Sequence, residues 1–425
     1  MQEIKKINLS LDYETYPLKE LNEGASVFSG FAFKSKDFSD KGIPIVKIKN
    51  IQNKSVDLKE VQYFPLDKVN NKHKKFFLKN NDVLIAMTGQ GSLGRVGRIN
   101  LESNEYVLLN QRVGKFVVDE KNLHLNYLYH VISSDMYEKI LFDRGTGSGQ
   151  PNLSPEIILG TEIPMPNLTT QKKISSILDN INSKINLNKK INKNLEKTLI
   201  TIFNSWFINF ENYDNSKGMK IDDSYGEIPV DWSVEMLEDY VDFVTGVEPG
   251  SKNYHEKPEP NDIPFLRVGD LGSRDNGVFI DPSLSKNKIL KYDDIVLSLD
   301  ATIGIVKMGL EGAYSTGMRK LVIKNDNINQ PFLYCLVKSN RIQRIIETFA
   351  TGTTILHAGK SIKHMNFVLS DKKTMDDFGK IGNPIISIIL TNLKEIEYLT
   401  NLRDTLLPKL MSGEIDVSKI NCDLE

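Results

Sequence analysis

Apolar residues follow two kinds of spacing that alternate along this chain. Residues 16–166 combine short β-rich runs with Gly-rich turns, and they include one predicted helix at 125–141. In residues 169–206 the apolar positions step by three and four, which is typical of a long amphipathic helix. Both kinds of spacing then recur, with a β-rich stretch that ends near Asp371 and a stepped stretch at 385–410. The pattern predicts two mixed domains, each followed by a long helix.

The expected divisions of the chain follow from these changes. A stretch rich in Asp, Asn, Ser and Lys separates the first helix from the second domain. Gly413 is expected to end the second helix, and Pro384 is expected near its start, where proline is tolerated. The predicted segments are a first domain at 1–168, a helix at 169–211, a linker at 212–225, a second domain at 226–372, a helix at 373–415 and a tail at 416–425.

The two long helices carry apolar seams that favour pairing with each other. About 40 residues at ~1.5 Å rise would give a rigid rod of ~60 Å, which would hold the two domains at a fixed separation. Asn188 and Asn192 interrupt the first seam and would fix the register of the pair at some cost in stability. The alternative is that each helix packs only on its own domain. The predicted seam residues are Ile181, Ile185, Asn188, Asn192, Leu195, Leu199, Ile389, Leu393, Ile396, Leu399, Leu402 and Leu406.

The two halves of the chain repeat one unit. The strand pattern at residues 43–48 recurs at 263–268, and each copy has proline second and a cation fifth. Asp294 lies 212 residues after Asp82 at the start of a second repeated run, and Leu333 lies 205 residues after Leu128 further on. The loop at 145–148 has a counterpart at 351–354. Two long copies argue against a solenoid or a propeller, which needs three or more repeats of much shorter period.

Composition narrows the classes of protein that fit. At 425 residues the chain can form two domains with separate cores, and its 40% hydrophobic and 26% charged residues are typical of a soluble globular protein. The first residues lack the apolar stretch of an export signal and no run approaches ~18 apolar residues, so a cytoplasmic protein is expected. The formal net charge of -1 gives no general attraction to nucleic acid, which local basic clusters would have to supply.

Cysteines and histidines do not indicate a metal site. Cys335 and Cys422 stand far apart without a paired cysteine or a close histidine, so neither a disulfide framework nor a zinc site is predicted. Structural or surface roles are expected for the histidines that lack metal-ligand spacing and a partner nucleophile. These are His124, His130, His255 and His364.

Three runs, in a fixed order, carry a resemblance to a known family. They are QKKISSILD at residues 171–179, GEIPVDW at 226–232 and LRDTLLPKLMSGEI at 402–415. Together with the duplication they make the chain resemble the specificity subunit of type I restriction-modification systems over essentially its whole length. The chain departs from that pattern at residues 204–207 (NSWF), which lack a proline-lysine-leucine signature, and at 298–300 (SLD), which replace the turn at 86–88 (AMT).

The resemblance implies both a fold and a role. The fold is α+β, with two similar α/β target recognition domains joined by two long antiparallel helices that form a coiled-coil spacer, in a pseudo-two-fold internal repeat. Each domain would read one half of an interrupted, asymmetric site on double-stranded DNA. The chain would bind two adenine-N6 methyltransferase subunits and, through them, motor-nuclease restriction subunits. It would catalyse nothing and bind no cofactor itself, because S-adenosylmethionine, ATP and Mg are expected on the partners, which flip the target adenine.

Base-edge reading in the major groove needs Arg or Lys for guanine and Asn or Gln for adenine. The loops at residues 88–92 and 144–152 carry such side chains with little bulk around them, and the loop at 351–357 repeats the second of them. The alternative for each loop is an ordinary Gly-rich surface turn. The readers favoured in the first domain are Gln90, Arg144, Gln150 and Asn152.

Contacts with DNA phosphates need cations without sequence content. Basic runs are also typical of a solvated face that binds nothing. If the runs do bind phosphate, DNA affinity falls steeply with salt. The runs are Lys68, Lys72, His73, Lys74 and Lys75, then Lys286 with Lys288, and Lys360 with Lys363. The full set of predicted DNA contacts is Lys72, Lys74, Thr88, Gln90, Arg144, Thr146, Gln150, Asn152, Arg274, Lys286, Lys288, Thr302, Thr353, His357 and Lys360.

An enzyme is the first alternative, and the sequence argues against it. Residues 359–361 read Gly-Lys-Ser, but Thr354 stands where a phosphate-binding loop needs a glycine. The nearest match to a methyltransferase tetrad, NPII at 383–386, lacks the second proline and the aromatic ring. A nuclease would need clustered carboxylates, and Asp119 with Glu120 is too common a pair to count. The second alternative is a coiled-coil scaffold that never binds DNA, which salt-dependent DNA binding would exclude.

Overall fold

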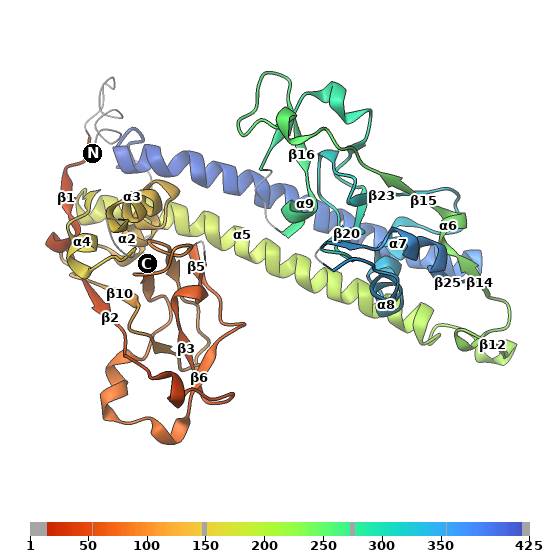
Figure 1. The fold of residues 1–425 in the computed structure, drawn as a ribbon, viewed down its shortest axis with the longest axis horizontal. Helices are drawn as coiled ribbons and strands as arrows, with labels where there is room; N and C mark the ends of the chain where they lie inside the picture. Colours follow the sequence, from red (N-terminus) through yellow and green to blue (C-terminus); the bar gives the residue numbers. More distant parts are fainter. Residues whose placement is uncertain (1–14, 53, 147–150, 273–276, 354, 419–425) are drawn as a thin grey trace. The chain divides into compact units, whose positions relative to one another are not determined.

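The computed structural model describes residues 15–52, 54–146, 151–272, 277–353 and 355–418. The chain divides into two compact units, unit 1 with residues 1–184 and 399–425, and unit 2 with residues 185–398. Unit 1 contains the first β-rich domain and unit 2 contains the second, as the colours of Figure 1 show along the sequence. Both long helices contribute residues to both units, so the division does not follow the ends of the predicted segments.

The described strands of unit 1 form a six-stranded sheet of order β2-β10-β7-β8-β5-β4, a three-stranded sheet β6-β3-β9 and the pair β1-β11. The central strand β7 is buried throughout, because Val83 and Ile85 face one apolar core while Leu84 and Ala86 face another. The strands are β1 (Leu18–Glu20), β2 (Ala25–Ser29), β3 (Ile43–Val46), β4 (Ile51–Gln52), β5 (Lys54–Val56), β6 (Gln62–Phe64), β7 (Val83–Ala86), β8 (Val96–Arg98), β9 (Leu108–Leu109), β10 (Val113–Val118) and β11 (Glu162–Pro164).

The helix predicted at residues 125–141 is two helices, so that prediction was wrong. α2 (Leu125–Ile132) ends before Ser133, and α3 (Asp135–Gly145) begins after Ser134. The Ser134 hydroxyl accepts a hydrogen bond from the backbone N–H of Tyr137, which is the usual cap at the start of a helix. Apolar residues continue through both helices and concealed the break. A third short helix, α4 (Pro155–Leu159), follows.

The described strands of unit 2 include sheets of order β15-β23-β19-β21 and β17-β16-β22-β18, and the pairs β12-β13, β14-β25 and β20-β24. Its short helices are α6 (Leu237–Tyr240), α7 (Gln330–Lys338) and α8 (Asn340–Thr348). The strands are β12 (Met219–Asp222), β13 (Gly226–Pro229), β14 (Ser233–Met236), β15 (Val241–Thr245), β16 (Ile263–Leu266), β17 (Phe279–Ile280), β18 (Ile289–Leu290), β19 (Ile295–Ser298), β20 (Asp300–Ala301), β21 (Val306–Lys307), β22 (Gly312–Tyr314), β23 (Met318–Ile323), β24 (Leu356–His357) and β25 (Asn366–Leu369).

The two units share one topology, which confirms the predicted internal repeat. The order β2-β10-β7-β8 in unit 1 matches β15-β23-β19-β21 in unit 2, and β6-β3-β9 matches β17-β16-β22. The parallel pair β3-β9 also has a parallel counterpart in β16-β22. Helices α2 and α3 precede α4 in the first copy as α7 and α8 precede the 3-10 turn at Gly359–His364 in the second.

The stretch predicted as a linker contains a strand of a β-hairpin, which its composition did not indicate. Strand β12 lies within the predicted linker and pairs with β13 in antiparallel register, Met219 opposite Pro229. Just before it, Tyr213 packs its ring 5.9 Å from the ring of Trp232. Residues 212–225 are polar because most positions of the hairpin are exposed. Only a few residues of this segment are buried against the rest of the unit.

The long helices are α5 (Leu168–Phe203), continued by a π-helical turn at Asn204–Ile208, and α9 (Lys372–Ser412). Helix α5 therefore ends short of residue 211, the end that apolar spacing predicted. Gly413 follows α9 with φ +85°, a left-handed conformation that suits glycine and ends the helix as expected. Pro384 lies inside α9 and not near its start. Because proline has no backbone N–H, it cannot donate the helical hydrogen bond to the carbonyl of Lys380.

Within each unit the two long helices run antiparallel, as predicted. In unit 1 the Arg403 guanidinium of α9 donates to Asn182 Oδ1 of α5 at 3.1 Å. Lys173 of α5 donates to the backbone carbonyl of Ser418, which lies beyond the end of α9, at 2.7 Å. In unit 2 Asn188 Nδ2 donates to Glu395 Oε2 at 2.7 Å, and Asn192 Nδ2 donates to the carbonyl of Ile389 at 3.0 Å. In both units, later residues of α5 contact earlier residues of α9 or of the segment that follows it, which is the pattern of an antiparallel pair.

Every predicted seam residue is buried or half-buried in its own unit. Asn188 is 1% exposed and Ile396 is fully buried, so the two polar seam positions are integral to the helix contact, as predicted. The predicted tail is structured in its described part, because Val417 packs into the main apolar core of unit 1. The seam residues' function as a spacer stays a prediction.

Candidate nucleic-acid interface

The two loops that the sequence singled out in the first domain meet at the end of β7. Thr88 and Asn152 form an isolated antiparallel β-bridge. The backbone N–H of Leu153 donates to the carbonyl of Met87 at 2.8 Å, and that of Asn152 donates to Gly145 at 3.0 Å. The loop that leaves β7 and the loop that leaves α3 are therefore joined by main-chain hydrogen bonds.

Unit 2 contains the same junction. Strand β20 pairs with β24 so that Asp300 lies opposite His357, and the N–H of Ala358 donates to Leu299 at 2.7 Å. Asp300 lies 212 residues after Thr88, and His357 lies 205 residues after Asn152, which are the offsets found between the two copies in the sequence. The junction is therefore a repeated feature, and a chance turn of one domain would not recur at both offsets.

The side chains at the two junctions differ in chemistry. In unit 1 the carboxamide of Asn152 is exposed, whereas Thr88 is half-buried and its hydroxyl oxygen is buried. In unit 2 the His357 imidazole Nδ1 lies 2.8 Å from Asp300 Oδ1, and the two side chains are 62% and 25% exposed. The backbone positions match while the groups that they present do not. The departure at residues 298–300 noted in the sequence lies at this junction.

Arg319, which the sequence did not single out, interacts electrostatically with Asp300 of the Asp300–His357 pair. Its guanidinium donates to the carbonyl of Met318 at 3.1 Å and to that of Thr316, and burial lowers the pKa of the guanidinium. Arg319 stands 205 residues after Gly114, so a cation in unit 2 replaces a glycine in unit 1. Strict alignment of the two copies would have shown this replacement.

The predicted readers have different surroundings. Gln90 is exposed in its loop. Arg144 is also exposed, but its Nη1 donates to the carbonyl of Gly160 at 2.9 Å and to Thr161 Oγ1 at 3.3 Å, where it caps the end of α4. Thr146 donates to the carbonyl of Asp143 and so closes α3. The structure therefore gives Arg144 and Thr146 structural contacts that the sequence did not predict.

The remaining predicted contacts divide by exposure. Thr302, Thr353, Lys286 and Lys360 are exposed, and Lys288 is half-buried. Thr302 also closes its own turn, because its carbonyl accepts a hydrogen bond from Ser298 Oγ at 2.6 Å. Gln150 and Arg274 lie outside the described residues.

The basic run of the first domain lies on a 3-10 helix at Asn71–Phe76, which begins with a hydrogen bond from the Lys72 N–H to Asn70 Oδ1 at 3.0 Å. Lys72 and Lys74 are exposed, and no side-chain hydrogen bond or ion pair joins either ammonium to another described residue. The charge of Lys68 is partly neutralised, because its ammonium lies 3.4 Å from Asp37. Lys72 and Lys74 are therefore the lysines of the run best placed to contact phosphate.

His73 does not belong to the exposed basic run, so that assignment was wrong. It is 5% exposed, and its Nδ1 accepts a hydrogen bond from the backbone N–H of Asn70 at 3.1 Å. Its ring packs edge-on against Phe31 with centroids 4.7 Å apart. His73 completes an aromatic core together with Phe76, because residues three apart share one face of a 3-10 helix.

A cluster of largely buried polar side chains joins α5 to the first domain. His130 Nε2 lies 2.9 Å from Asp179 Oδ1, and the Arg98 guanidinium lies 3.2 Å from the same oxygen. Because a carboxylate only accepts, His130 carries its proton on Nε2, and burial lowers the pKa of His130 and keeps it neutral. Burial acts to raise the pKa of Asp179, but the hydrogen bond from His130 and the charge of Arg98 lower it below its usual value. The structural role predicted for His130 fits this contact.

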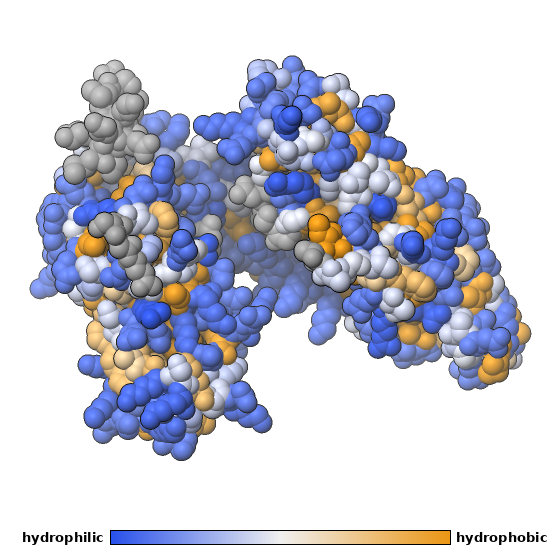
Figure 2. Space-filling model, in the orientation of Figure 1, coloured by the Kyte–Doolittle hydropathy of each residue, from blue (hydrophilic) through white to orange (hydrophobic). Residues whose placement is uncertain are grey.

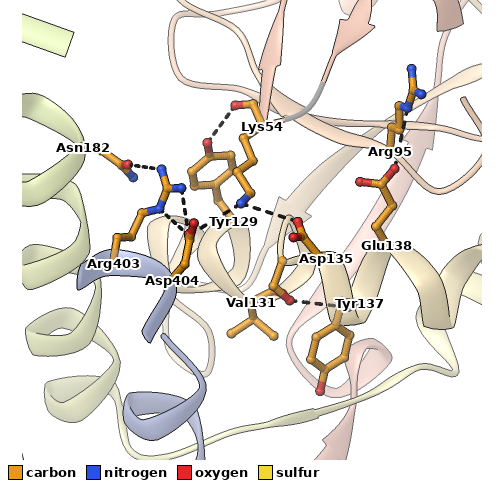
Figure 3. A network of polar contacts seen from close by, with 11 residues as sticks. Lys54, Arg95, Tyr129, Val131, Asp135, Tyr137, Glu138, Asn182, Arg403 and Asp404 are labelled. Atoms are coloured by element: carbon orange, nitrogen blue, oxygen red, sulfur yellow. Dashed lines mark hydrogen bonds and ion pairs between the residues drawn. The ribbon is translucent and has the colours of Figure 1, made fainter. Parts of the chain in front are cut away.

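A second polar network joins α9 to the same domain (Figure 3). The ammonium of Lys54 lies 3.6 Å from Asp135 and 3.9 Å from Asp404, and its carbonyl accepts a hydrogen bond from the Tyr129 hydroxyl at 2.8 Å. Figure 3 shows Arg403 extending from α9 to Asn182 of α5 beside this group. Both long helices are therefore fixed to the first domain by ionic contacts. The sequence analysis missed this network.

The described residues contain no group of three or more His, Cys, Asp and Glu side chains that could hold a metal ion. No helix in the described ranges has the length and apolarity needed to cross a membrane. On the face drawn in Figure 2, polar side chains dominate and apolar ones form small groups.

Comparison with known proteins fits the repeat. A family model described as the type I restriction modification DNA specificity domain matches residues 11–197 and again residues 229–404. The chain belongs to this family. Each match covers one mixed domain and most of the long helix that follows it, so the repeated unit of the family is the repeated unit of the fold.

Relatives carry names from the same systems. The type I restriction enzyme MjaIX specificity subunit of Methanocaldococcus jannaschii is 29% identical over 72% of this chain and 72% of its own length. The HindI specificity subunit of Haemophilus influenzae is 23% identical over 80% of this chain and 87% of its own length. A crystal structure of the type I S subunit from M. genitalium has a similar fold, with a TM-score of 0.55 at 17% identity over 95% of this chain and 97% of that one. The family resemblance expected from three sequence runs is confirmed.

Proposed function

We propose that this chain sets the DNA sequence specificity of a type I restriction-modification complex, with unit 1 reading one half of a bipartite site and unit 2 the other. One observation supports this most directly. The same loop junction recurs in both units, with Thr88 and Asn152 in one and Asp300 and His357 in the other. Equal domains would read equal half-sites, whereas this difference suits an asymmetric site.

The proposal places backbone contacts on exposed cations and base contacts on the junction loops. Lys72 and Lys74 in unit 1 and Lys286 and Lys360 in unit 2 are exposed, as phosphate contacts require. Because the formal net charge is only -1, attraction to DNA would come from these local positions. Affinity would fall steeply as salt rises, since each phosphate contact releases bound counterions.

The chain would act only in an assembly, in the cytoplasm. Two adenine-N6 methyltransferase subunits would bind it, and restriction subunits with motor and nuclease activity would bind through them. S-adenosylmethionine, ATP and Mg would bind to those partners. This chain would recognise the DNA sequence and would not catalyse a reaction. The names of its relatives as type I restriction enzyme specificity subunits support this assignment.

The experiment is a genome-wide map of N6-methyladenine in cells that co-express this chain with the methyltransferase encoded beside it. Cells that lack this chain are the control. The expected result is an interrupted, asymmetric motif that is methylated only when this chain is present. No new methylation, with both proteins soluble and associated, would contradict the proposal and favour a scaffold that does not read DNA.

A binding assay separates the two outcomes further. The assembled complex should bind duplex DNA that contains the mapped motif, with an affinity that falls as salt rises. A double substitution, Lys72→Gln with Lys74→Gln, should weaken binding to all sequences alike without loss of assembly, because phosphate contacts carry no sequence information. Lys252→Gln, at another exposed lysine, is a control for the change of charge.

A further inference from the structure

The Asp300–His357 pair gives unit 2 a polar group of fixed tautomer. A carboxylate only accepts hydrogen bonds, so neutral His357 must carry its proton on Nδ1, 2.8 Å from Asp300 Oδ1. The second ring nitrogen, Nε2, is then a hydrogen-bond acceptor. The His357 side chain is 62% exposed, so a ligand can reach it. The pair presents one acceptor in a defined chemical state.

The backbone under His357 is held on two sides. Its N–H donates to the carbonyl of Thr351 at 2.8 Å, and its carbonyl accepts from the Thr351 N–H at 3.0 Å. The next residue, Ala358, is bound to Leu299 of the neighbouring strand at 2.7 Å. Gly352 makes the tight turn possible with φ +107°, since a Cβ there would overlap the carbonyl of Ile355. A reading group needs this kind of preorganised support.

Bases in the major groove differ in what they offer to such an acceptor. Cytosine N4 and adenine N6 carry amino groups that donate, whereas guanine O6 and thymine O4 are acceptors at comparable positions. An acceptor at Nε2 attracts the first two bases and repels the last two. Asn152, the matching residue of unit 1, carries both a donor and an acceptor, a combination that suits adenine and not cytosine.

We infer that the Asp300–His357 pair determines one base of the half-site read by unit 2. His357 Nε2 accepts a hydrogen bond from the exocyclic amino group of a cytosine or an adenine. Asp300 is a positioning residue that fixes the tautomer and touches no base. The inference rests on the proposed function and adds to it the residue pair and the class of base. It also explains why the pair occurs in one copy only, because the two half-sites differ.

The test uses the same methylation map of N6-methyladenine. His357→Ala in the full complex should reduce the preference for the amino-bearing base about 10-fold at one position of one half-site. The other half-site should stay unchanged, because it is read by unit 1. Asp300→Ala should relax the same position. In a His357→Ala background, Asp300→Ala should have no additional effect, since it acts only through His357.

A matched control exists in the same unit. His255 Nδ1 lies 2.6 Å from Asp262 Oδ2, so Asp262→Ala breaks a second His–Asp pair away from the junction. The methylated motif should be the same with and without this change. If His357→Ala proves insoluble, His357→Asn is the second variant. It should shift the preference at that position toward adenine, which a carboxamide recognises through two hydrogen bonds.

The outcomes separate the inference from the function on which it rests. A motif that is unchanged in His357→Ala overturns the inference and leaves the proposed function intact. Where the base is a cytosine, an unchanged motif in His357→Asn does the same. A further relaxation by Asp300→Ala in the absence of His357 overturns the positioning role. If the unaltered chain directs no methylation at all, the proposed function itself is wrong.

Discussion

His130 in α2 and Cys335 in α7 occupy matching positions, 205 residues apart, and both are buried. Burial raises the pKa of the Cys335 thiol to about 12, and it lowers the pKa of the His130 imidazole. Both groups are thereby held uncharged at neutral pH. Only His130 can be forced to charge by mild acid, so the two units should respond differently to pH.

The first prediction follows from His130 and from His124, whose pKa burial also lowers. Both folded pKa values lie below the ordinary ~6.5, so the unfolded state takes up more protons as pH falls below that value. The free energy of unfolding should therefore decrease from pH 7.5 to pH 5.5. Urea denaturation at the two pH values measures this change. The double variant His124→Asn with His130→Asn should lose less stability over the same range.

His255 is the control with the opposite sign. The hydrogen bond to Asp262 raises the pKa of His255, so its contribution is present below the ordinary imidazole pKa and is lost as pH rises through the folded value. His255→Asn should therefore make the loss of stability on acidification larger. Equal pH dependence in all three proteins would show that these histidines do not control the response.

Arg144 tests the structural contact against the reading role. Its hydrogen bond to the carbonyl of Gly160 closes α4, so Arg144→Ala should lower the free energy of unfolding by about 1 kcal/mol. The methylated motif should not change. Gln90→Ala is the contrasting variant, because Gln90 is exposed in its loop and should affect the motif without affecting stability. A relaxed motif in Arg144→Ala with unchanged stability would restore Arg144 as a reader.

At the scale of elements, α9 packs closely on the start of α7. A Cβ at Gly382 would overlap Pro331 and lie 2.8 Å from its Cγ, so no larger residue fits without movement. Gly382→Ala should destabilise unit 2 by about 1–3 kcal/mol, although alanine favours helix by about 1 kcal/mol. Thermal unfolding checks this. Asn383→Ala, at the next and exposed position of the helix, should be neutral or stabilising.

The same elements show what sequence could predict. Steps of three and four positions located both long helices and their buried seams, because burial of one face is what produces that spacing. The break at Ser134 and the hairpin at β12 were missed, since a single cap and a few exposed strand residues leave no periodic signal. Pro384 was predicted near a helix start, where the missing N–H is tolerated, but α9 begins earlier, at Lys372.

The candidate site was predicted in part for a related reason. The repeat located the junction loops, because equivalent positions recur at offsets of 212 and 205 residues. It could not show that Arg144 turns back onto α4 or that Asp300 orients His357, since both depend on contacts between residues far apart in the chain. The type of a side chain indicates what it can bind. Only the fold shows which side chains already make hydrogen bonds within the protein.

At the scale of the whole molecule, the two units share a pair of long helices and differ at their junctions. The polar contacts between the helices in unit 2, from Asn188 to Glu395 and from Asn192 to Ile389, define which segments face each other. If the pair acts as the spacer proposed above, its length sets the gap between half-sites and its side chains do not set their sequence. Length and sequence should then be separable by deletion.

The last prediction uses these contacts to choose the deletion. Removing residues 188–194 of α5 together with residues 389–395 of α9 takes one heptad from each facing segment and preserves the apolar seam. Seven residues at ~1.5 Å rise correspond to about 10 Å, or about 3 base pairs at ~3.4 Å each. The methylation map should show a shorter gap between two unchanged half-sites. Asn188→Ala with Asn192→Ala, which keeps the length, should keep the gap. Altered half-sites with the original gap would mean that the helices do not measure the distance.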